Sequence, residues 1–113
     1  MPEEREWPTR WLRGFLELAV LAVLSEGESY GYAVAQRLDE HGFGWIKGGT
    51  LYPVLARLER QGAVETRWGE GMGGPGRKFY ALTTEGRRRL HRERAQWADF
   101  VAAANGLLEV GPR

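Results

Sequence analysis

Residues 49–62 (GTLYPVLARLERQG) constrain the fold of this chain more than any other segment, because they contain the start, both faces and the end of one helix. The hydroxyl of Thr50 can cap the first turn, where Pro53 is tolerated because the backbone N–H groups there have no helical partner. Gly62 supplies the left-handed residue that commonly ends a helix. At about 100° per residue, one side carries Leu51, Leu55 and Leu58. The segment is predicted to be an amphipathic helix that buries this side.

The opposite side of the predicted helix has an unusual composition. It combines small residues with arginines, without the mixed acids and bases of an ordinary solvated helix: Gly49, Pro53, Ala56 and Arg60, flanked by Arg57. A bare, basic face of this kind suits close approach to a polyanion. From this segment alone, two interpretations stay open: a helix that reads DNA, and a capped surface helix with no partner.

Composition narrows the class of protein. The chain has 113 residues, enough for one domain with a modest core, and no cysteine for a disulfide or a thiolate site. No set of carboxylates, nucleophiles or histidines has the spacing of a catalytic or metal site, so we expect no enzyme, no metal and no cofactor. The N-terminus is acidic and the longest apolar run, residues 18–24, is short. A cytoplasmic protein without a membrane segment is therefore expected.

Charge is distributed unevenly along the chain. The formal net charge is only +1. Residues 77–94 nevertheless contain many more bases than acids, whereas residues 1–30 are mainly acidic. The average therefore conceals a basic segment in the second half of the chain.

The first thirty residues are predicted to contain an arm and a helix. Residues 1–9 are polar, include two prolines and are expected to be flexible. Residues 10–25 follow a helical period with two apolar stripes, and the second stripe contains Leu18 and Leu21. A small domain buries one stripe in its own core, so we expect the second to meet another long helix, from this chain or from a partner.

A second helix is predicted from Tyr30 to about His41, with Ser29 as its cap and with Val34 and Leu38 facing inward. Gly31 in its first turn lowers helix propensity, which indicates close contact with a neighbouring backbone. A glycine-rich connector over residues 42–49 then leads to the helix described first.

Two strands are predicted after that helix. Residues 63–68 and 77–82 alternate between two faces, and the residues between them include five glycines in positions 69–76. These glycines also match the dinucleotide-binding pattern G-x-G-x-x-G. A strand follows them instead of the helix that would receive a pyrophosphate, so this match is rejected. The segment is predicted to be a hairpin with a long tip.

The last helix is predicted over residues 84–108, capped by Thr83 or Thr84. Five residues in it are spaced like the seam of a coiled coil: Leu90, Trp97, Val101, Ala104 and Leu108. The seam is expected to pack on a partner chain, and folding back on the first helix of the same chain is the alternative.

The order of these elements predicts a winged helix-turn-helix, mainly α with a small β-hairpin, followed by a long C-terminal helix for dimerisation. We expect a flexible arm at 1–9, a DNA-binding domain at 10–83, the dimerisation helix at 84–108 and a tail at 109–113. In such a fold the third helix enters the major groove and the wing reaches a neighbouring phosphate or the minor groove. Arg77 and Lys78 lie where a wing needs cations.

Several motifs resemble the PadR family of bacterial transcriptional regulators. They are GTLYP at 49–53 with the residues up to Gly62, YGY at 30–32, GRKFY at 76–80 and LTTEG at 82–86. The short C-terminus resembles the compact subclass, in which one long helix replaces a separate C-terminal domain. The family more often has a capping Ser or Pro where this chain has Lys47-Gly48-Gly49, so a helix start two or three residues from Thr50 stays open.

This resemblance implies a cytoplasmic, nucleoid-associated homodimer that binds a palindromic operator on double-stranded DNA and represses transcription. It places Thr50, Tyr52 and Pro53 near the DNA, with Tyr52 on a phosphate. Helical geometry and the wing complete the expected DNA-binding set: Gly49, Thr50, Tyr52, Pro53, Arg57, Arg60, Arg77 and Lys78. The alternative function is a winged-helix module that binds proteins without specific DNA binding.

The resemblance also implies a small-molecule effector for some members, a flat aromatic or cationic compound held between the subunits against an aromatic residue of the last helix. Trp97 lies at a comparable place, with Phe100 and Val101 nearby. An aromatic at a seam position also serves plain packing. Both roles for Trp97 stay open.

Overall fold

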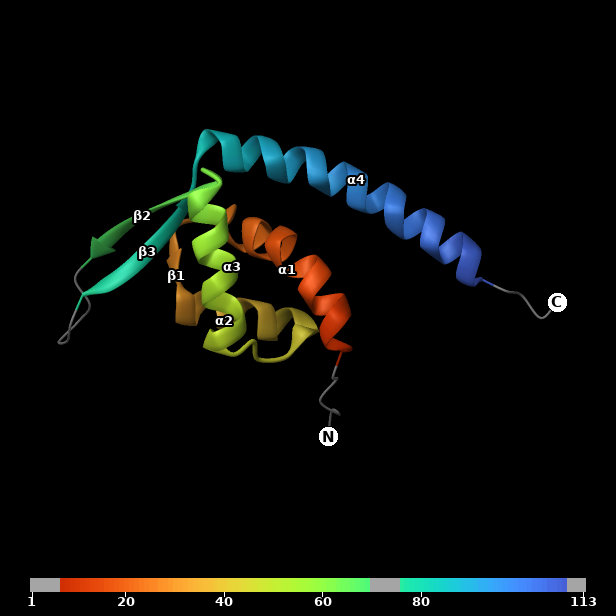
Figure 1. Cartoon of the computed structure of the whole chain (residues 1–113), viewed down its shortest axis with the longest axis horizontal. Helices are drawn as coiled ribbons and strands as arrows, with labels where there is room; N and C mark the ends of the chain where they lie inside the picture. Colours follow the sequence, from red (N-terminus) through yellow and green to blue (C-terminus); the bar gives the residue numbers. More distant parts are fainter. Residues whose placement is uncertain (1–6, 70–75, 110–113) are drawn as a thin grey trace.

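The computed structural model describes residues 7–69 and 76–109. Its elements are α1 (Thr9–Leu24), β1 (Ser29–Tyr30), α2 (Gly31–Leu38), the π-helical turn η1 (Asp39–Phe43), α3 (Gly48–Arg60), β2 (Val64–Gly69), β3 (Arg77–Leu82) and α4 (Thr84–Leu108). Figure 1 shows α1, α2 and α3 gathered in one body, with the hairpin at one end and α4 running past the other. The prediction of a mainly helical fold with a small hairpin and a long last helix is confirmed.

The core lies between α1, α2, α3 and the sheet. The three leucines of α3 that the spacing selected are 0–1% exposed, and Val34 and Leu38 of α2 are also buried. Both apolar stripes of α1 contribute to this core, because Leu21, assigned to the second stripe, has no exposed surface. Leu21 is therefore a core residue of its own chain, and the expected dimer contact at this position is wrong. Leu18 remains half-buried at the edge of the core.

The sheet has the strand order β1-β3-β2, and both pairings are antiparallel. The hairpin runs in register from Val64 opposite Leu82 to Gly69 opposite Arg77, which confirms the predicted strands and their two faces. The expected tip, residues 70–75, lies outside the described part of the chain.

The short strand β1 replaces the predicted cap of the second helix. Ser29 pairs with Tyr80 of β3, and Tyr30 is the residue that precedes α2, without a capping hydrogen bond from any side chain. The prediction of Ser29 as cap is therefore wrong. A strand of two residues has no period that a sequence pattern could reveal. The helix also ends earlier than predicted, at Leu38, and the chain continues as η1 to Phe43, with the non-helical Gly42 at a φ of 95°.

The helix α3 begins two residues before Thr50. Lys47 is its N-cap, and the Lys47 carbonyl accepts hydrogen bonds from the N–H groups of Thr50 and Leu51, both at 2.9 Å. The predicted cap at Thr50 is therefore wrong, and Pro53 lies in the second turn, where it removes the bond that would reach the Gly49 carbonyl. No side-chain cap is present at this start. The preceding Ile46, 6% exposed, fixes the entry of the chain by burial instead.

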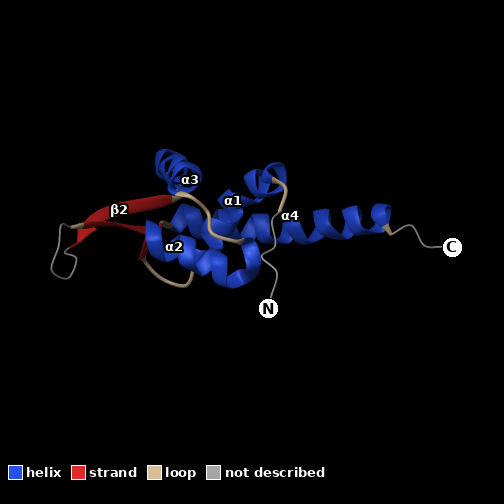
Figure 2. Ribbon diagram, turned by 90° about the horizontal axis from the view of Figure 1, so that it is seen from below, coloured by secondary structure: helices blue, strands red, loops and turns tan. Residues whose placement is uncertain are grey.

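Among the described residues, the helix α4 is buried only at its beginning. Thr83 caps it, with its hydroxyl accepting a hydrogen bond from the Gly86 N–H at 3.0 Å and donating one to the Gly62 carbonyl at 2.6 Å. Gly86 and Leu90 are its only buried residues among those described. Figure 2 shows the rest of α4 extending away from the body. Among the described helices, none is long and apolar enough to cross a membrane.

The predicted arm is described only from Trp7. The Trp7 indole N–H donates to the Gly42 carbonyl at 2.9 Å, and Thr9 already belongs to α1. This end of the predicted arm is therefore attached to η1.

Candidate nucleic-acid interface

The outward face of α3 is bare at its centre. Gly49, Pro53 and Arg60 are exposed, and Ala56 is half-buried. A Cβ added at Gly49 would meet no atom within 4 Å, so this part of the helix surface is open. Arg60 forms no ion pair with any residue in the described ranges, and its charge is free for an external partner.

The wing, which is the hairpin of β2 and β3, contacts one flank of α3. The Glu59 carboxylate accepts a hydrogen bond from the Thr66 hydroxyl at 2.9 Å and pairs with the Lys78 ammonium at 3.4 Å. The hydrogen bond from Thr66 and the charge of Lys78 lower the pKa of Glu59, which is therefore ionised at neutral pH. Lys78, expected to contact DNA, thus lies beside a carboxylate of the same chain.

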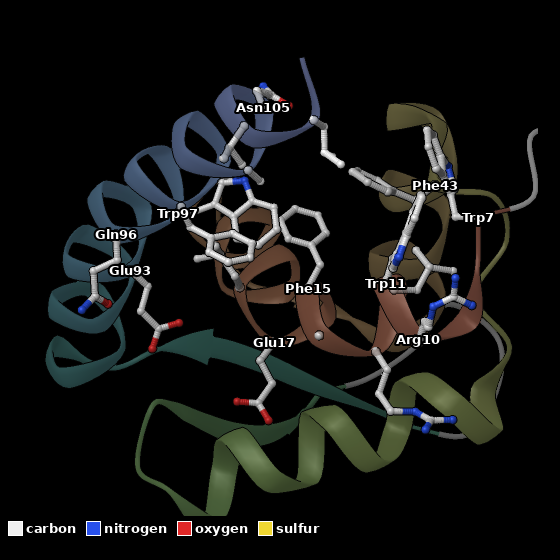
Figure 3. Close-up of a pocket in the computed structure, with 18 of the residues that line it drawn as sticks. Trp7, Arg10, Trp11, Phe15, Glu17, Phe43, Glu93, Gln96, Trp97 and Asn105 are labelled. Carbon is white, nitrogen blue, oxygen red and sulfur yellow. The ribbon is translucent and has the colours of Figure 1, made fainter. Parts of the chain in front are cut away.

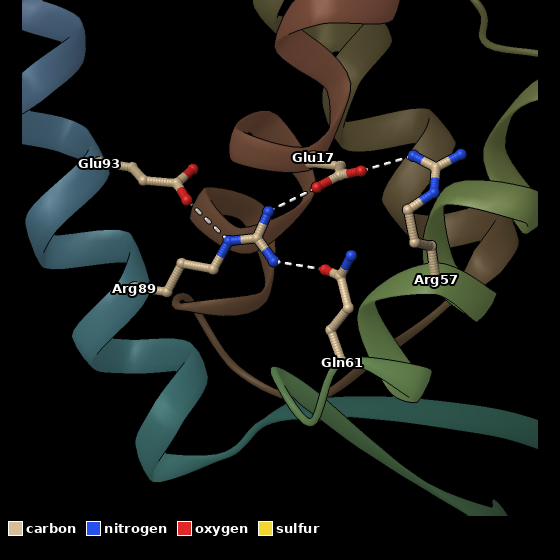
Figure 4. Close-up of polar contacts among 5 residues, drawn as sticks. All are labelled: Glu17, Arg57, Gln61, Arg89 and Glu93. Carbon is tan, nitrogen blue, oxygen red and sulfur yellow. Dashed lines mark hydrogen bonds and ion pairs between the residues drawn. The ribbon is translucent and has the colours of Figure 1, made fainter.

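The other flank of α3 is held by α1. Figure 4 shows the Glu17 carboxylate between Arg57 of α3 and Arg89 of α4, each bonded to one of its oxygens at 2.5 Å. Arg89 also donates to Glu93 at 2.8 Å and to Gln61 at 2.7 Å. Arg57, expected to contact DNA, is therefore part of a polar network that joins three helices.

A cleft of about 650 Å³ lies between α3 and the wing. It is lined by aromatic and basic residues: Tyr30, Gly31, Tyr32, Tyr52, Trp68, Arg77, Lys78 and Tyr80. The Arg77 guanidinium lies 4.4 Å from the centre of the Tyr30 ring, and Trp68 is 72% exposed. Cations, hydroxyls and aromatic edges beside an open helix face suit a phosphodiester backbone.

Four aromatic residues of this cleft were missed by sequence reasoning as site residues. Tyr30 was expected as the start of a helix, Tyr32 as part of a family motif, and Trp68 and Tyr80 as strand residues, with Tyr80 also in the GRKFY motif. A tryptophan at the end of a strand, directly before the glycines of the hairpin, was a signal for Trp68, since large aromatic residues are enriched where they can meet a partner. For Tyr30 and Tyr80 no local signal existed, because they are brought together by the pairing of β1 with β3, in which Ser29 lies opposite Tyr80 and Tyr30 opposite Phe79, and the sequence did not predict β1.

Tyr52 is placed in this cleft by a glycine. A Cβ built on Gly31 would lie 2.6 Å from Tyr52 Cζ, and Gly48 also faces the same ring. Gly31 was expected to allow contact with a backbone, so this expectation is corrected: the contact is with the Tyr52 side chain. The ring is half exposed, and its edge can reach a partner.

A second, larger groove of about 1120 Å³ lies between α1 and α4. Figure 3 shows Trp97 and Phe15 side by side in it, and their ring centres lie 5.0 Å apart. Phe100 and Val101 line the same groove, so the structure brings the three expected effector residues together. Of the expected dimer residues, Leu18, Ala104 and Leu108 also line it. Leu90, 5% exposed, belongs to the chain's own core instead, and we correct its assignment to the dimer contact.

Comparisons with known proteins agree on one family. Residues 20–92 match the model of the "Transcriptional regulator PadR-like family". The chain is 33% identical to Transcriptional regulator Rv3488 of Mycobacterium tuberculosis over 82 residues, which cover 73% of this chain and 75% of that protein. A PadR family regulator from Eggerthella lenta has a similar structure, with a TM-score of 0.81, 40% identity and coverage of 91% of this chain and 89% of that one.

A PadR-like regulator from Bacillus cereus is similar over almost its entire length, with a TM-score of 0.79, 31% identity and coverage of 90% of this chain and 99% of that one. The family match over residues 20–92 includes the end of α1, all of α2 and α3, and the hairpin that shapes the interface described above. The chain therefore belongs to the PadR-like family of transcriptional regulators, a family of DNA-binding proteins and not of enzymes.

Proposed function

We propose that this regulator is a repressor that binds a palindromic operator as a homodimer. The observation that carries the proposal is the open face of α3, with the unpaired Arg60 at its C-terminal end, beside the aromatic and basic cleft of the wing. In a twofold dimer, two such faces about 34 Å apart would enter successive major grooves.

Within each half-site we assign two different roles. Arg60 and the bare surface around Gly49, Thr50 and Pro53 approach the base edges, because small residues there let the helix lie deep in the groove. Tyr52 and Arg77, both in the cleft, hold the phosphate backbone and position the helix. Lys78 contributes less, since Glu59 already neutralises it.

The homodimer follows from the unburied half of α4. Beyond Leu90 none of its described residues is buried. Three large apolar residues there are exposed: Phe100 at 63%, Leu107 at 81% and Leu108 at 73%. An apolar surface of this kind, continuous with the groove along α1, is expected to be covered. A second copy of the chain supplies the matching α1 and α4, so an isologous contact covers both exposed surfaces at once.

An aromatic or cationic effector is the finer part of the proposal. Trp97, Phe100 and Val101 line one groove, and the carboxylates of Glu17 and Glu93 lie along it. Flat rings could stack on Trp97, whereas both carboxylates are already paired with arginines, so the aromatic contact supports an effector more than the charge does. The tilted contact of Trp97 with Phe15 supports the plain packing role equally. Localisation at the nucleoid in the cytoplasm stays a prediction that follows from repression.

A mobility shift with the DNA upstream of its own gene tests the proposal. Binding at low salt and loss of binding at high salt are expected, because phosphate neutralisation releases counterions. A folded protein that gives no shift at low salt would favour the alternative, a winged-helix module that binds proteins.

Two substitutions test the assigned roles. Arg77→Ala should flatten the dependence of log affinity on log salt by roughly 0.9 while sequence preference stays the same. Arg60→Ala should instead relax discrimination at one base position by roughly 1–3 kcal/mol if this arginine reads a guanine. If Arg77→Ala changed sequence preference and Arg60→Ala changed only the salt dependence, Arg77 would read a base and Arg60 would bind a phosphate.

A further inference from the structure

The Glu17 carboxylate of α1 pairs with α3 of the same chain. Its Oε2 accepts a hydrogen bond from Arg57 Nη1 and its Oε1 one from Arg89 Nη2, both at 2.5 Å (Figure 4). Arg57 lies 40 residues from Glu17 in the sequence and Arg89 lies 72 residues away. One acidic side chain of α1 therefore binds a cation from α3 and another from α4.

The position of Arg57 on α3 decides what this pair means for DNA. Arg57 and Arg60 are three residues apart, which places them about 60° apart around the helix. Around the helix axis, Arg60, the last residue of α3, thus points along the middle of the outward face, and Arg57 lies at its edge toward α1. The Arg57 side chain is 45% exposed, so it remains within reach of solvent and of a phosphate that passes this edge.

Glu17 also has a second partner that stays in place. The Arg89 side chain is only 18% exposed and is fixed further by Glu93 and Gln61. If Arg57 leaves, the Glu17 carboxylate is still paired with Arg89 and is not stranded without a cation. Exchange of Arg57 from Glu17 to another anion is therefore a local change that keeps the network of α1 and α4 intact.

We propose that Glu17 withholds Arg57 from DNA: in the free protein the carboxylate occupies the place of a phosphate, and Arg57 adds no counterion release to non-specific binding. The proposal rests on the DNA-binding function proposed above. Glu17 is a positioning residue, because it acts on DNA only through Arg57. The carboxylate lowers the affinity for arbitrary DNA, which depends on the number of phosphates neutralised, and leaves base readout by Arg60 unchanged.

The test uses the full chain and a mixed-sequence duplex of roughly two helical turns, with affinity measured by fluorescence anisotropy at several salt concentrations. Glu17→Gln should tighten binding at low salt and steepen the slope of log affinity against log salt by roughly 0.9, since one more phosphate is neutralised. Between 50 and 200 mM salt this adds about a 3.5-fold loss of affinity. Adding Arg57→Gln to Glu17→Gln should return the slope to its original value.

The matched control is Glu93→Gln. It removes the same charge from a residue that also bonds Arg89, but it does not touch Arg57. Any general gain from the higher net charge appears in both variants, and only Glu17→Gln should show the steeper slope. Equal slopes for the two variants would overturn the proposal.

Arg57→Gln in the otherwise unchanged protein gives a second, independent result. If Glu17 withholds Arg57, this substitution leaves the salt slope unchanged. A slope flattened by roughly 0.9 would show that Arg57 already binds a phosphate, and the proposal would be wrong. If the unchanged protein shows no salt-dependent binding to any duplex, the proposed function fails and this proposal fails with it; if it binds and only these variants deviate, the function stands.

Discussion

Gly31 leaves open the space that the ring of Tyr52 occupies. The two residues come from α2 and α3, and a Cβ at position 31 would overlap the end of the Tyr52 side chain. Because Tyr52 lines the cleft beside the wing, a missing side chain on one helix determines where an exposed aromatic of the next helix points.

Gly31→Ala is expected to displace Tyr52 and weaken DNA binding with little loss of stability. The tyrosine ring is half exposed and can swing away from the added methyl group, so the core need not rearrange. Anisotropy with an operator or a mixed duplex measures the loss. In a Tyr52→Ala background, Gly31→Ala should have no further effect on DNA binding. An equal loss of binding there would show that Gly31 does not act through Tyr52.

Gly86→Ala should destabilise the fold. An added Cβ would overlap the backbone carbonyl of Ala63, which cannot move aside as a flexible side chain can. We expect a loss of about 1–3 kcal/mol in the free energy of unfolding, measured by urea denaturation. Gly106→Ala in the same helix is the control, since a Cβ there meets nothing within 4 Å. That variant should be as stable as the original chain or slightly more stable.

Thr83→Ala should also lower stability, by about 1–2 kcal/mol, because it removes both the cap on Gly86 and the hydrogen bond to Gly62. Thr83→Ser keeps the hydroxyl and is expected to retain most of this stability. Urea denaturation of the three chains makes the comparison. Equal losses for alanine and serine would mean that the methyl group, and not the hydroxyl, stabilises this junction.

Ala104→Glu should break the proposed dimer, whereas Ala103→Glu should not. Ala104 lines the groove between α1 and α4, and its neighbour Ala103 is exposed and does not. The two variants share the same change in charge and in helix propensity. Burial of an unpaired carboxylate at Ala104 is expected to raise the dimer dissociation constant about tenfold or more, as measured by sedimentation. Equal dimer dissociation constants for the two variants would show that the dimer contact does not include Ala104.

The Glu17 network should make stability depend on acid in a defined direction. Partial burial would raise the pKa of Glu17, but hydrogen bonds and charge from Arg57 and Arg89 outweigh it, and the net pKa lies below its ordinary value of 4.5. The stabilisation is therefore fully present above pH 4.5 and is lost as the pH falls through the lowered pKa.

Thermal unfolding at several pH values measures this effect. Glu17→Gln should lower Tm at neutral pH, and the difference from the original chain should shrink progressively below pH 4.5, as Glu17 becomes protonated. Comparison with the glutamine variant isolates Glu17 from Glu59, whose pKa is lowered too. A difference in Tm that stays constant down to low pH would exclude ionisation of Glu17 as the source of stability.

The sequence by itself determined the helices and strands that have a regular spacing of apolar residues. Periods of 3.6 and 2 residues identified the helices and the two strands of the hairpin, and the leucines of α3 could be assigned to the core because their spacing places them on one face. The hydroxyl of Thr83 could be recognised as a cap because it acts on its own neighbours. The bare face around Arg60 follows from the same local geometry.

Only the tertiary structure decided the contacts between distant residues. Strand β1 exists because Ser29 meets Tyr80, and Leu21 is core because α1 lies across the other helices. Helix α3 has no side-chain cap at its start and follows the buried Ile46, so it begins at Gly48, before Thr50. The pairing of Arg57 with Glu17 spans 40 residues. The spacing of residues shows which face of a helix is apolar or basic. Which acidic residue a basic face contacts depends on how the helices pack.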